Sequence, residues 1–117
     1  MEEQLQYKMT IKLWKKEKVF GPGVMELLEQ IEKFGSLQKA TDHMGLAYSK
    51  GWKMLRTSEK ELGFPLTTRL VGGKDGGGSV VTEQGKEMMR RYAAFEKEAK
   101  AQVDALFSKY FSPEEKG

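Results

Sequence analysis

The sequence contains no cysteine and only one histidine, His43. Without cysteine the chain cannot form disulfide bonds, use a thiol in catalysis or hold a thiolate-bound metal. No carboxylate stands at ligand spacing from His43, so we expect a solvated histidine, no metal site and no bound cofactor. No nucleophile–base pair can be built around this lone histidine, and we therefore expect a protein that is not an enzyme.

Long apolar runs are also missing, and none approaches the length of a membrane-spanning helix. The acidic N-terminus, with Glu2 and Glu3, lacks the basic start of a signal peptide. We therefore expect a cytoplasmic protein without a membrane partner.

Charged residues are abundant but unevenly distributed. They make up 32% of the 117 residues, and 20 basic against 17 acidic side chains give a net charge of +3. Residues 46–74 hold six basic and two acidic residues, whereas residues 81–117 hold seven of each. The basic excess is therefore concentrated in one segment, as the neutralisation of nucleic-acid phosphates requires.

The first third of the chain shows a strand pattern followed by a helix pattern. Apolar and polar residues alternate from Tyr7 to Trp14, and this period of two predicts a strand with one buried face. Gly21-Pro22-Gly23 breaks the chain, and Pro22 favours the start of a helix. Apolar residues then recur at helical spacing at Val24, Leu27, Leu28, Ile31 and Phe34.

Two further helices joined by a tight turn are predicted next. Gly35 is a C-cap signal and Ser36 an N-cap signal, so a short helix is expected to run from Ser36 to Met44. After a turn at Gly45, a basic helix is expected from Tyr48 to Leu62. Its helical wheel places Gly51, Leu55, Ser58 and Leu62 on the core side, and Ser49, Lys53, Arg56 and Lys60 on the opposite side.

A glycine-rich loop separates two short strand patterns. The predicted strands are Leu66 to Val71 and Val80-Val81, and residues 72–78 between them are GGKDGGG. A nucleotide-binding P-loop is rejected, because it requires Gly-Lys-Ser/Thr leading into a helix, whereas Lys74 is followed by Asp75 in a hairpin. The hairpin is either an exposed tip or a wing whose backbone N–H groups and Lys74 approach a phosphate.

A long amphipathic helix of about 28 residues is predicted after an N-cap at Thr82. A single chain of this size can hardly cover the whole apolar stripe, so we expect the helix to pair with its copy in a homodimer. The stripe consists of Met88, Tyr92, Phe95, Ala99, Val103, Leu106 and Tyr110.

Together these elements predict a mainly α fold with a small β wing. It comprises a winged helix-turn-helix in residues 6–82, a dimerisation helix in residues 83–111 and a tail in residues 112–117. Such a unit inserts one helix into the major groove of double-stranded DNA and lays the wing along the backbone. The expected groove contacts are Tyr48, Ser49, Lys50 and Lys53, and the expected phosphate contacts are Arg56, Lys74 and Gly76.

Other interpretations of the same residues stay open. The basic helix face is either a DNA contact or a solvated surface, and the surrounding helix, turn and wing favour DNA. Trp52 is interpreted as packing between the basic helix and the strands, whereas Tyr48 could equally pack or stack on a base. The alternative function, from another class, is a winged-helix protein–protein interaction module without DNA binding.

Several segments in combination resemble the N-terminal DNA-binding domain of the molybdate-responsive regulators, the ModE family, which is related to the LysR-type winged helix. The segments are KLW at residues 12–14, FGPG at 20–23, LL at 27–28, GSLQKA at 35–40, YSKGW at 48–52, ELGFPLTTR at 61–69, GGKDGGG at 72–78 and VTEQG at 81–85. The resemblance implies a dimeric transcriptional regulator whose last helices pair, with further DNA contacts from Ser36 and Gln38.

Three departures from the family accompany this resemblance. The family's C-terminal molybdate-binding domain is absent from the 117 residues, so we expect no molybdate site in this chain. Ala47 stands where such domains often carry a serine N-cap, and alanine is a poor cap. Ser58 stands where an apolar core residue is usual.

Overall fold

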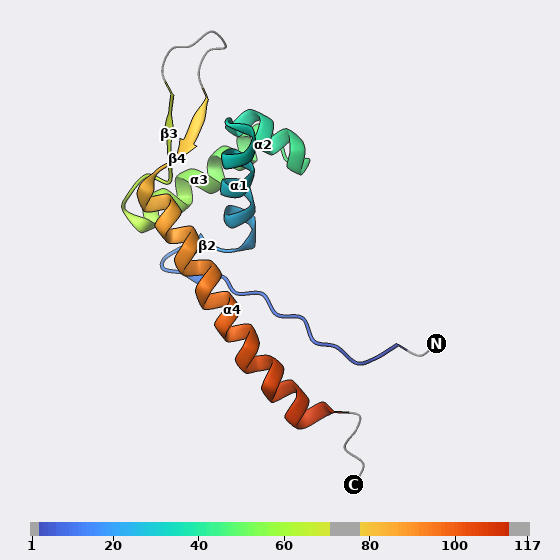
Figure 1. Cartoon of the computed structure of the whole chain (residues 1–117). Coiled ribbons are helices and arrows are strands. Elements are labelled where there is room, and N and C mark those ends of the chain that lie inside the picture. The colour runs from blue at the N-terminus through green and yellow to red at the C-terminus, as the bar shows by residue number, and fades with distance from the viewer. Residues whose placement is uncertain (1–2, 71–77, 113–117) are drawn as a thin grey trace.

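Figure 1 shows the computed structural model of the chain, which describes residues 3–70 and 78–112. Three helices and two short hairpins form one body, and a long last helix extends away from it. The elements are β1 (Leu13–Trp14), β2 (Lys18–Phe20), α1 (Pro22–Phe34), α2 (Leu37–Met44), α3 (Tyr48–Leu62), β3 (Thr67–Arg69), β4 (Ser79–Val81) and α4 (Glu83–Phe111). The fold is thus mainly helical with two small antiparallel sheets, β1–β2 and β3–β4.

The core is built around the apolar face of α1. Its residues at helical spacing, Val24, Leu27, Leu28 and Ile31, are all buried, as the sequence pattern predicts. The helix begins with Pro22, whose fixed φ suits a first turn, and ends at Gly35, which adopts a left-handed φ of 77°. Buried side chains of α2, α3, β2, β4 and α4 belong to the same core.

The predicted helix pair is confirmed, including its caps. The Lys39 backbone N–H donates to Ser36 Oγ over 3.0 Å, which satisfies one of the free donors at the start of α2. Gly45 ends α2 with a φ of 70°, a left-handed conformation that favours glycine. The tight turn between α2 and α3 follows from this one residue.

Helix α3 buries the side predicted from its wheel, with Gly51, Leu55 and Ser58 all buried. Ser58 replaces an apolar residue without leaving a polar group unpaired, because its hydroxyl donates to the Val19 carbonyl of β2. Ala47 provides no side-chain cap for α3. The hydroxyl of Ser58 therefore connects the buried side of α3 to the hairpin β1–β2.

In the hairpin β3–β4, Thr67–Arg69 pair with Ser79–Val81, and the Leu70 N–H donates to the Gly78 carbonyl over 2.8 Å. The sequence pattern suggests a strand over residues 66–71, of which Leu66 lies before β3 and Val71 lies outside the described residues. Backbone groups on either side hold the hairpin in place. The Leu66 N–H donates to Glu59 Oε2 of α3 over 2.7 Å, and the Ser79 N–H donates to the Gly35 carbonyl over 2.9 Å.

The predicted first strand is wrong over most of its length. Only Leu13 and Trp14 pair with β2, and residues 3–12 belong to no sheet. The alternation of half-buried and exposed side chains from Tyr7 onward is nevertheless present. It arises because this segment lies along α4, where the Tyr92 hydroxyl donates to the Ile11 carbonyl over 2.8 Å. Alternating apolar residues thus indicate that one side of the segment is covered, but they do not indicate which element covers it.

Helix α4 begins as predicted, with the Gly85 N–H donating to Thr82 Oγ1 over 2.9 Å. Its 29 residues give a length of roughly 43 Å. Only the first third reaches the core, through Gly85, Met89 and Tyr92. The remainder projects beyond the body, accompanied by the N-terminal segment (Figure 1).

Candidate nucleic-acid interface

The outward face of α3 is polar, exposed and basic. Ser49, Lys53, Arg56 and Lys60 are all exposed, and they lie opposite the buried Gly51 and its neighbours. This placement follows from the helical period, because residues three or four apart share one side of a helix. The face meets the geometric requirement for a helix that enters a DNA groove.

A cleft of about 580 Å³ separates α3 and the start of α2 from the β3–β4 hairpin. From α2 it is lined by Ser36 and Gln38, and from α3 by Tyr48 and Arg56. The structure therefore brings four of the predicted contact residues into one cleft. Thr67, Arg69 and Ser79 line the opposite wall.

Ser36 and Gln38 each have an internal hydrogen bond. Ser36 Oγ accepts the capping bond from Lys39, and Gln38 Nε2 donates to Asp42 Oδ1 over 3.1 Å. Gln38 and Asp42 are one helical turn apart on the exposed side of α2. The amide of Gln38 therefore stays at the surface, at the edge of the cleft.

Arg56 is held in a defined position by two neighbours. Its Nη1 atom lies 2.8 Å from Glu59 Oε1, and its guanidinium carbon lies 5.2 Å from the centre of the Trp52 ring. Glu59 is fixed in turn, because its other carboxylate oxygen accepts the Leu66 N–H. The arginine is thus pre-oriented at the mouth of the cleft, with its charge partly offset by Glu59.

Trp52 differs from the sequence interpretation. It lies on the side of α3 that faces the strands, but it is 46% exposed and lines the cleft there. Tyr48, at the start of α3, is 43% exposed in the same cleft. Both rings are therefore accessible to a ligand of the cleft.

Several cations around the outward face of α3 form no ion pair with an acidic side chain among residues 3–70 and 78–112. Such uncompensated charges attract phosphate groups and release counterions when they bind them. They are Lys39, Lys50, Lys53, Lys60 and Arg69.

Lys50 and Lys53 lie away from the cleft, on the other side of α3. They border a second recess of about 350 Å³ together with the hairpin β1–β2. Sequence reasoning predicted no contact residue in this hairpin, because the sequence pattern does not indicate that residues 15–18 lie beside α3.

The predicted wing contacts Lys74 and Gly76 lie outside the described residues.

The predicted dimerisation stripe lies on α4, within the described residues, and divides into two parts. Met88 and Tyr92 pack within the chain, and Tyr92 is only 2% exposed. Large apolar side chains further along α4 do not belong to the core: Phe95 and Leu106 are each 52% exposed, and Tyr110 is 67% exposed. Ala99 and Val103 are half-buried.

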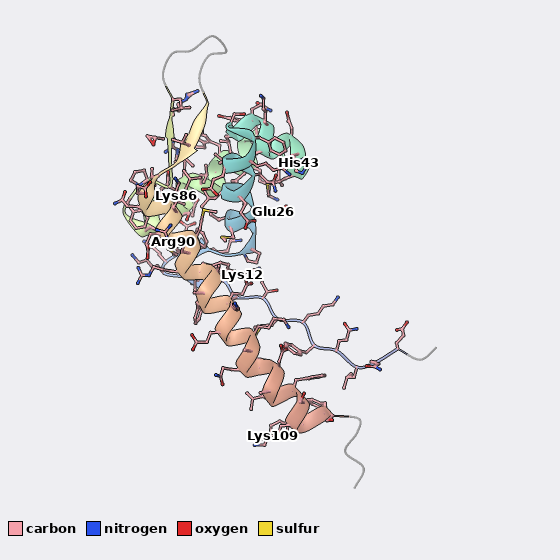
Figure 2. The ribbon with its side chains drawn as sticks, in the orientation of Figure 1. Lys12, Glu26, His43, Lys86, Arg90 and Lys109 are labelled. Atoms are coloured by element: carbon pink, nitrogen blue, oxygen red, sulfur yellow. The ribbon has the colours of Figure 1, made fainter. Side chains whose placement is uncertain are left out.

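His43 is exposed near the end of α2, as predicted (Figure 2). Its ring lies 4.9 Å from the ring of Phe34. No group of three potential metal ligands occurs among the residues that the structure describes. Within the same ranges, no helix has the length and hydrophobicity needed to span a membrane.

The amino-acid sequence is similar to those of several ModE and Mop proteins. No protein-family model matches the chain. It is 34% identical over 82 residues to the molybdenum transport protein ModE of Azotobacter vinelandii, a match that covers 70% of the chain and 30% of the relative. It is 30% identical over 90 residues to the DNA-binding transcriptional dual regulator ModE of Escherichia coli K12, covering 76% and 34%.

These matches support a relationship with the ModE family. A third relative is the molybdenum-pterin-binding protein MopB of Rhodobacter capsulatus, 36% identical over 76 residues that cover 65% of the chain and 28% of that protein. The matches cover about a third of the length of these ModE and MopB relatives. Several ModE relatives are named transcriptional regulators.

Proposed function

We propose that the chain is a sequence-specific, double-stranded DNA-binding transcriptional regulator of the ModE type. In this proposal residues 6–82 form a winged helix-turn-helix, with α2 and α3 as the helix pair and β3–β4 as the wing. The observation that carries the proposal is the outward face of α3, which is exposed and basic and is bordered by the capped start of α2 and by the hairpin.

The proposed roles follow from position along α3. Residues near the start of a groove-binding helix reach base edges, whereas later residues meet phosphates. We therefore assign base contacts to Tyr48, Ser49, Lys50 and Lys53. Arg56 is assigned to phosphate, because it is oriented by Glu59 and Trp52 at the edge of the face.

The start of α2 and the wing complete the proposed contact surface. Ser36 and Gln38 border the same cleft as Tyr48 and are expected to meet the backbone beside the groove. Lys74 and Gly76 are assigned to the wing, where a lysine and free backbone N–H groups suit a phosphate.

We also propose that the regulator is a homodimer that pairs through residues 83–111. Phe95, Leu106 and Tyr110 share one side of α4 and are at least half exposed, which is costly for large apolar side chains in water. A second copy of α4 would cover them. Two DNA-binding units related by a two-fold axis would then read a symmetric site.

Selection of bound sequences from a random pool of DNA duplexes tests this function. The proposal predicts enrichment of a motif with two-fold symmetry whose half-sites are spaced by about one helical turn or a multiple of it. A pool that stays random after repeated rounds at moderate salt would contradict the proposal. Loss of DNA binding at every salt concentration, with a stable protein partner retained, would favour the interaction module instead.

A further inference from the structure

The hairpin β1–β2 borders α3 on the side opposite β3–β4. The cleft beside β3–β4 is lined by Tyr48 and Arg56 of α3, whereas the recess beside β1–β2 is lined by Lys50, Lys53 and Thr57. Figure 1 shows β2 and the β3–β4 hairpin on different sides of α3. The outward face of this helix therefore has a hairpin along each edge.

Specific contacts fix the turn of β1–β2 to α3. Lys15 Nζ donates to the Glu61 carbonyl over 2.7 Å, and the Lys16 backbone N–H donates to Glu61 Oε1 over 3.3 Å. On the inner side, the Ser58 hydroxyl donates to Val19. The turn thus has a fixed position relative to the helix, which a precise contact requires.

The recess between the hairpin and α3 combines an apolar floor with a basic rim. Trp14, Val24 and Met54 supply the apolar surface, and Trp14 is 63% exposed. The charged residues that line the recess are four lysines and one glutamate, namely Lys16, Lys18, Lys50, Lys53 and Glu17. None of these lysines forms an ion pair within the described parts of the chain.

We propose that β1–β2 is a second contact with the DNA backbone, in addition to the wing. Lys16 and Lys18 bind phosphates on the strand that borders the far side of the groove entered by α3, and the exposed ring of Trp14 lies against the adjoining sugars. The inference rests on the proposed function and extends it. Because the major groove has a phosphate backbone on each edge, a helix within it leaves room for one hairpin at each backbone.

A DNA occupant is favoured because the recess is continuous with the outward face of α3. Lys53 belongs to both surfaces, and Lys50 lines the recess beside it, so a duplex that meets the outward face lies within reach of the hairpin. The rim carries cations in excess of its single acidic residue, which suits a phosphate backbone.

The test compares the salt dependence of binding by the full chain and a double variant, Lys16→Gln with Lys18→Gln. The matched control, Lys8→Gln with Lys97→Gln, removes the same charge from exposed lysines beside α4. Dissociation constants for a selected duplex are measured by fluorescence anisotropy over a range of KCl concentrations. The slope of log affinity against log salt is negative, and each lost phosphate contact makes it shallower by about 0.9, so we expect it to become shallower by about 2 per protomer. The control variant should keep the slope.

Sequence preference provides an independent readout. Phosphate contacts carry no sequence information, so the double variant should keep the ratio between its affinities for the selected and a scrambled duplex. A wild-type chain that binds no duplex would contradict the proposed function itself. A wild-type chain that binds, with an unchanged slope in a folded double variant, would overturn only the role of β1–β2.

Trp14 supplies a second measurement that does not depend on the folding of the double variant. In Trp52→Phe, Trp14 is the one remaining tryptophan of the sequence. Saturating duplex should protect its fluorescence from quenching by iodide. Equal quenching with and without bound duplex would overturn the proposal.

Discussion

At the scale of single residues, Gly51 determines how closely α3 can approach α2. A Cβ atom at this position would lie 2.4 Å from Thr41 Cγ2, far inside van der Waals contact. Thr41 cannot easily turn away, since it is fully buried and its hydroxyl donates to the Leu37 carbonyl over 3.0 Å. The contact therefore sets the geometry of the helix pair that the proposed function requires.

We predict that Gly51→Ala lowers the free energy of unfolding by about 1–3 kcal/mol, as overpacking of a core typically does. Urea denaturation followed by circular dichroism measures this change. The matched control is Gly23→Ala in α1, where a Cβ atom would meet only the flexible end of Met54 at 3.2 Å. An equal free energy of unfolding for Gly51→Ala and the wild type would show that α2 and α3 can move apart without loss of stability.

At the scale of elements, the N-terminal segment is attached to the far part of α4 by polar and aromatic contacts. The Tyr7 hydroxyl donates to Asp104 Oδ1, and the Tyr7 ring lies 5.1 Å from the ring of Phe107. The hydrogen bond from Tyr7, together with Lys100, lowers the pKa of the Asp104 carboxyl below its ordinary value. The lowered pKa means that the attachment stabilises the folded chain above the ordinary aspartate pKa of about 4 and loses this contribution as the pH falls through the lowered pKa.

We predict that Tyr7→Phe raises the pKa of Asp104 towards its ordinary value, because the substitution removes the hydroxyl donor and keeps the ring. An NMR titration of the Asp104 carboxyl carbon measures the shift. Tyr110→Phe, at an exposed tyrosine further along α4, should leave the pKa unchanged. The same Asp104 pKa in the wild type and Tyr7→Phe would refute the attachment through this hydrogen bond.

The elements also show how far the sequence determines the fold. The helices α1 to α4 and the caps at Ser36, Gly45 and Thr82 were predictable, because local spacing and local hydrogen bonds define them. The element that packs against residues 3–12 was not predictable. An apolar side chain at every second position can be covered equally well by a neighbouring strand or by α4.

The candidate interface was likewise predictable only in part. The outward face of α3 follows from helical periodicity, and the structure places Lys53 and Arg56 there. The exposure of Trp52 and the position of Lys16 and Lys18 beside Lys53 depend on contacts between segments distant in sequence. A single sequence contains no direct signal for those contacts.

At the scale of the whole molecule, we predict that Phe95→Asp combined with Leu106→Asp yields monomers. Both side chains are half exposed on one side of α4, and a carboxylate in a paired apolar stripe would be buried without a partner. Sedimentation velocity measures the change. The control, Ala94→Asp with Ala101→Asp, places the same charges at exposed positions on another side of the helix and should remain dimeric. An unchanged dimer in the first variant would remove α4 from the interface.

If the outward face of α3 reads DNA bases, as we propose, it sets the ratio of the dissociation constants for a selected and a scrambled duplex. For Lys53→Ala we predict that this ratio approaches unity through a loss of about 10-fold or more in affinity for the selected duplex, as expected for a lost base contact. Lys74→Ala should instead weaken both duplexes to a similar extent. Unchanged affinities of Lys53→Ala for both duplexes at moderate salt would show that the outward face of α3 does not read bases through Lys53.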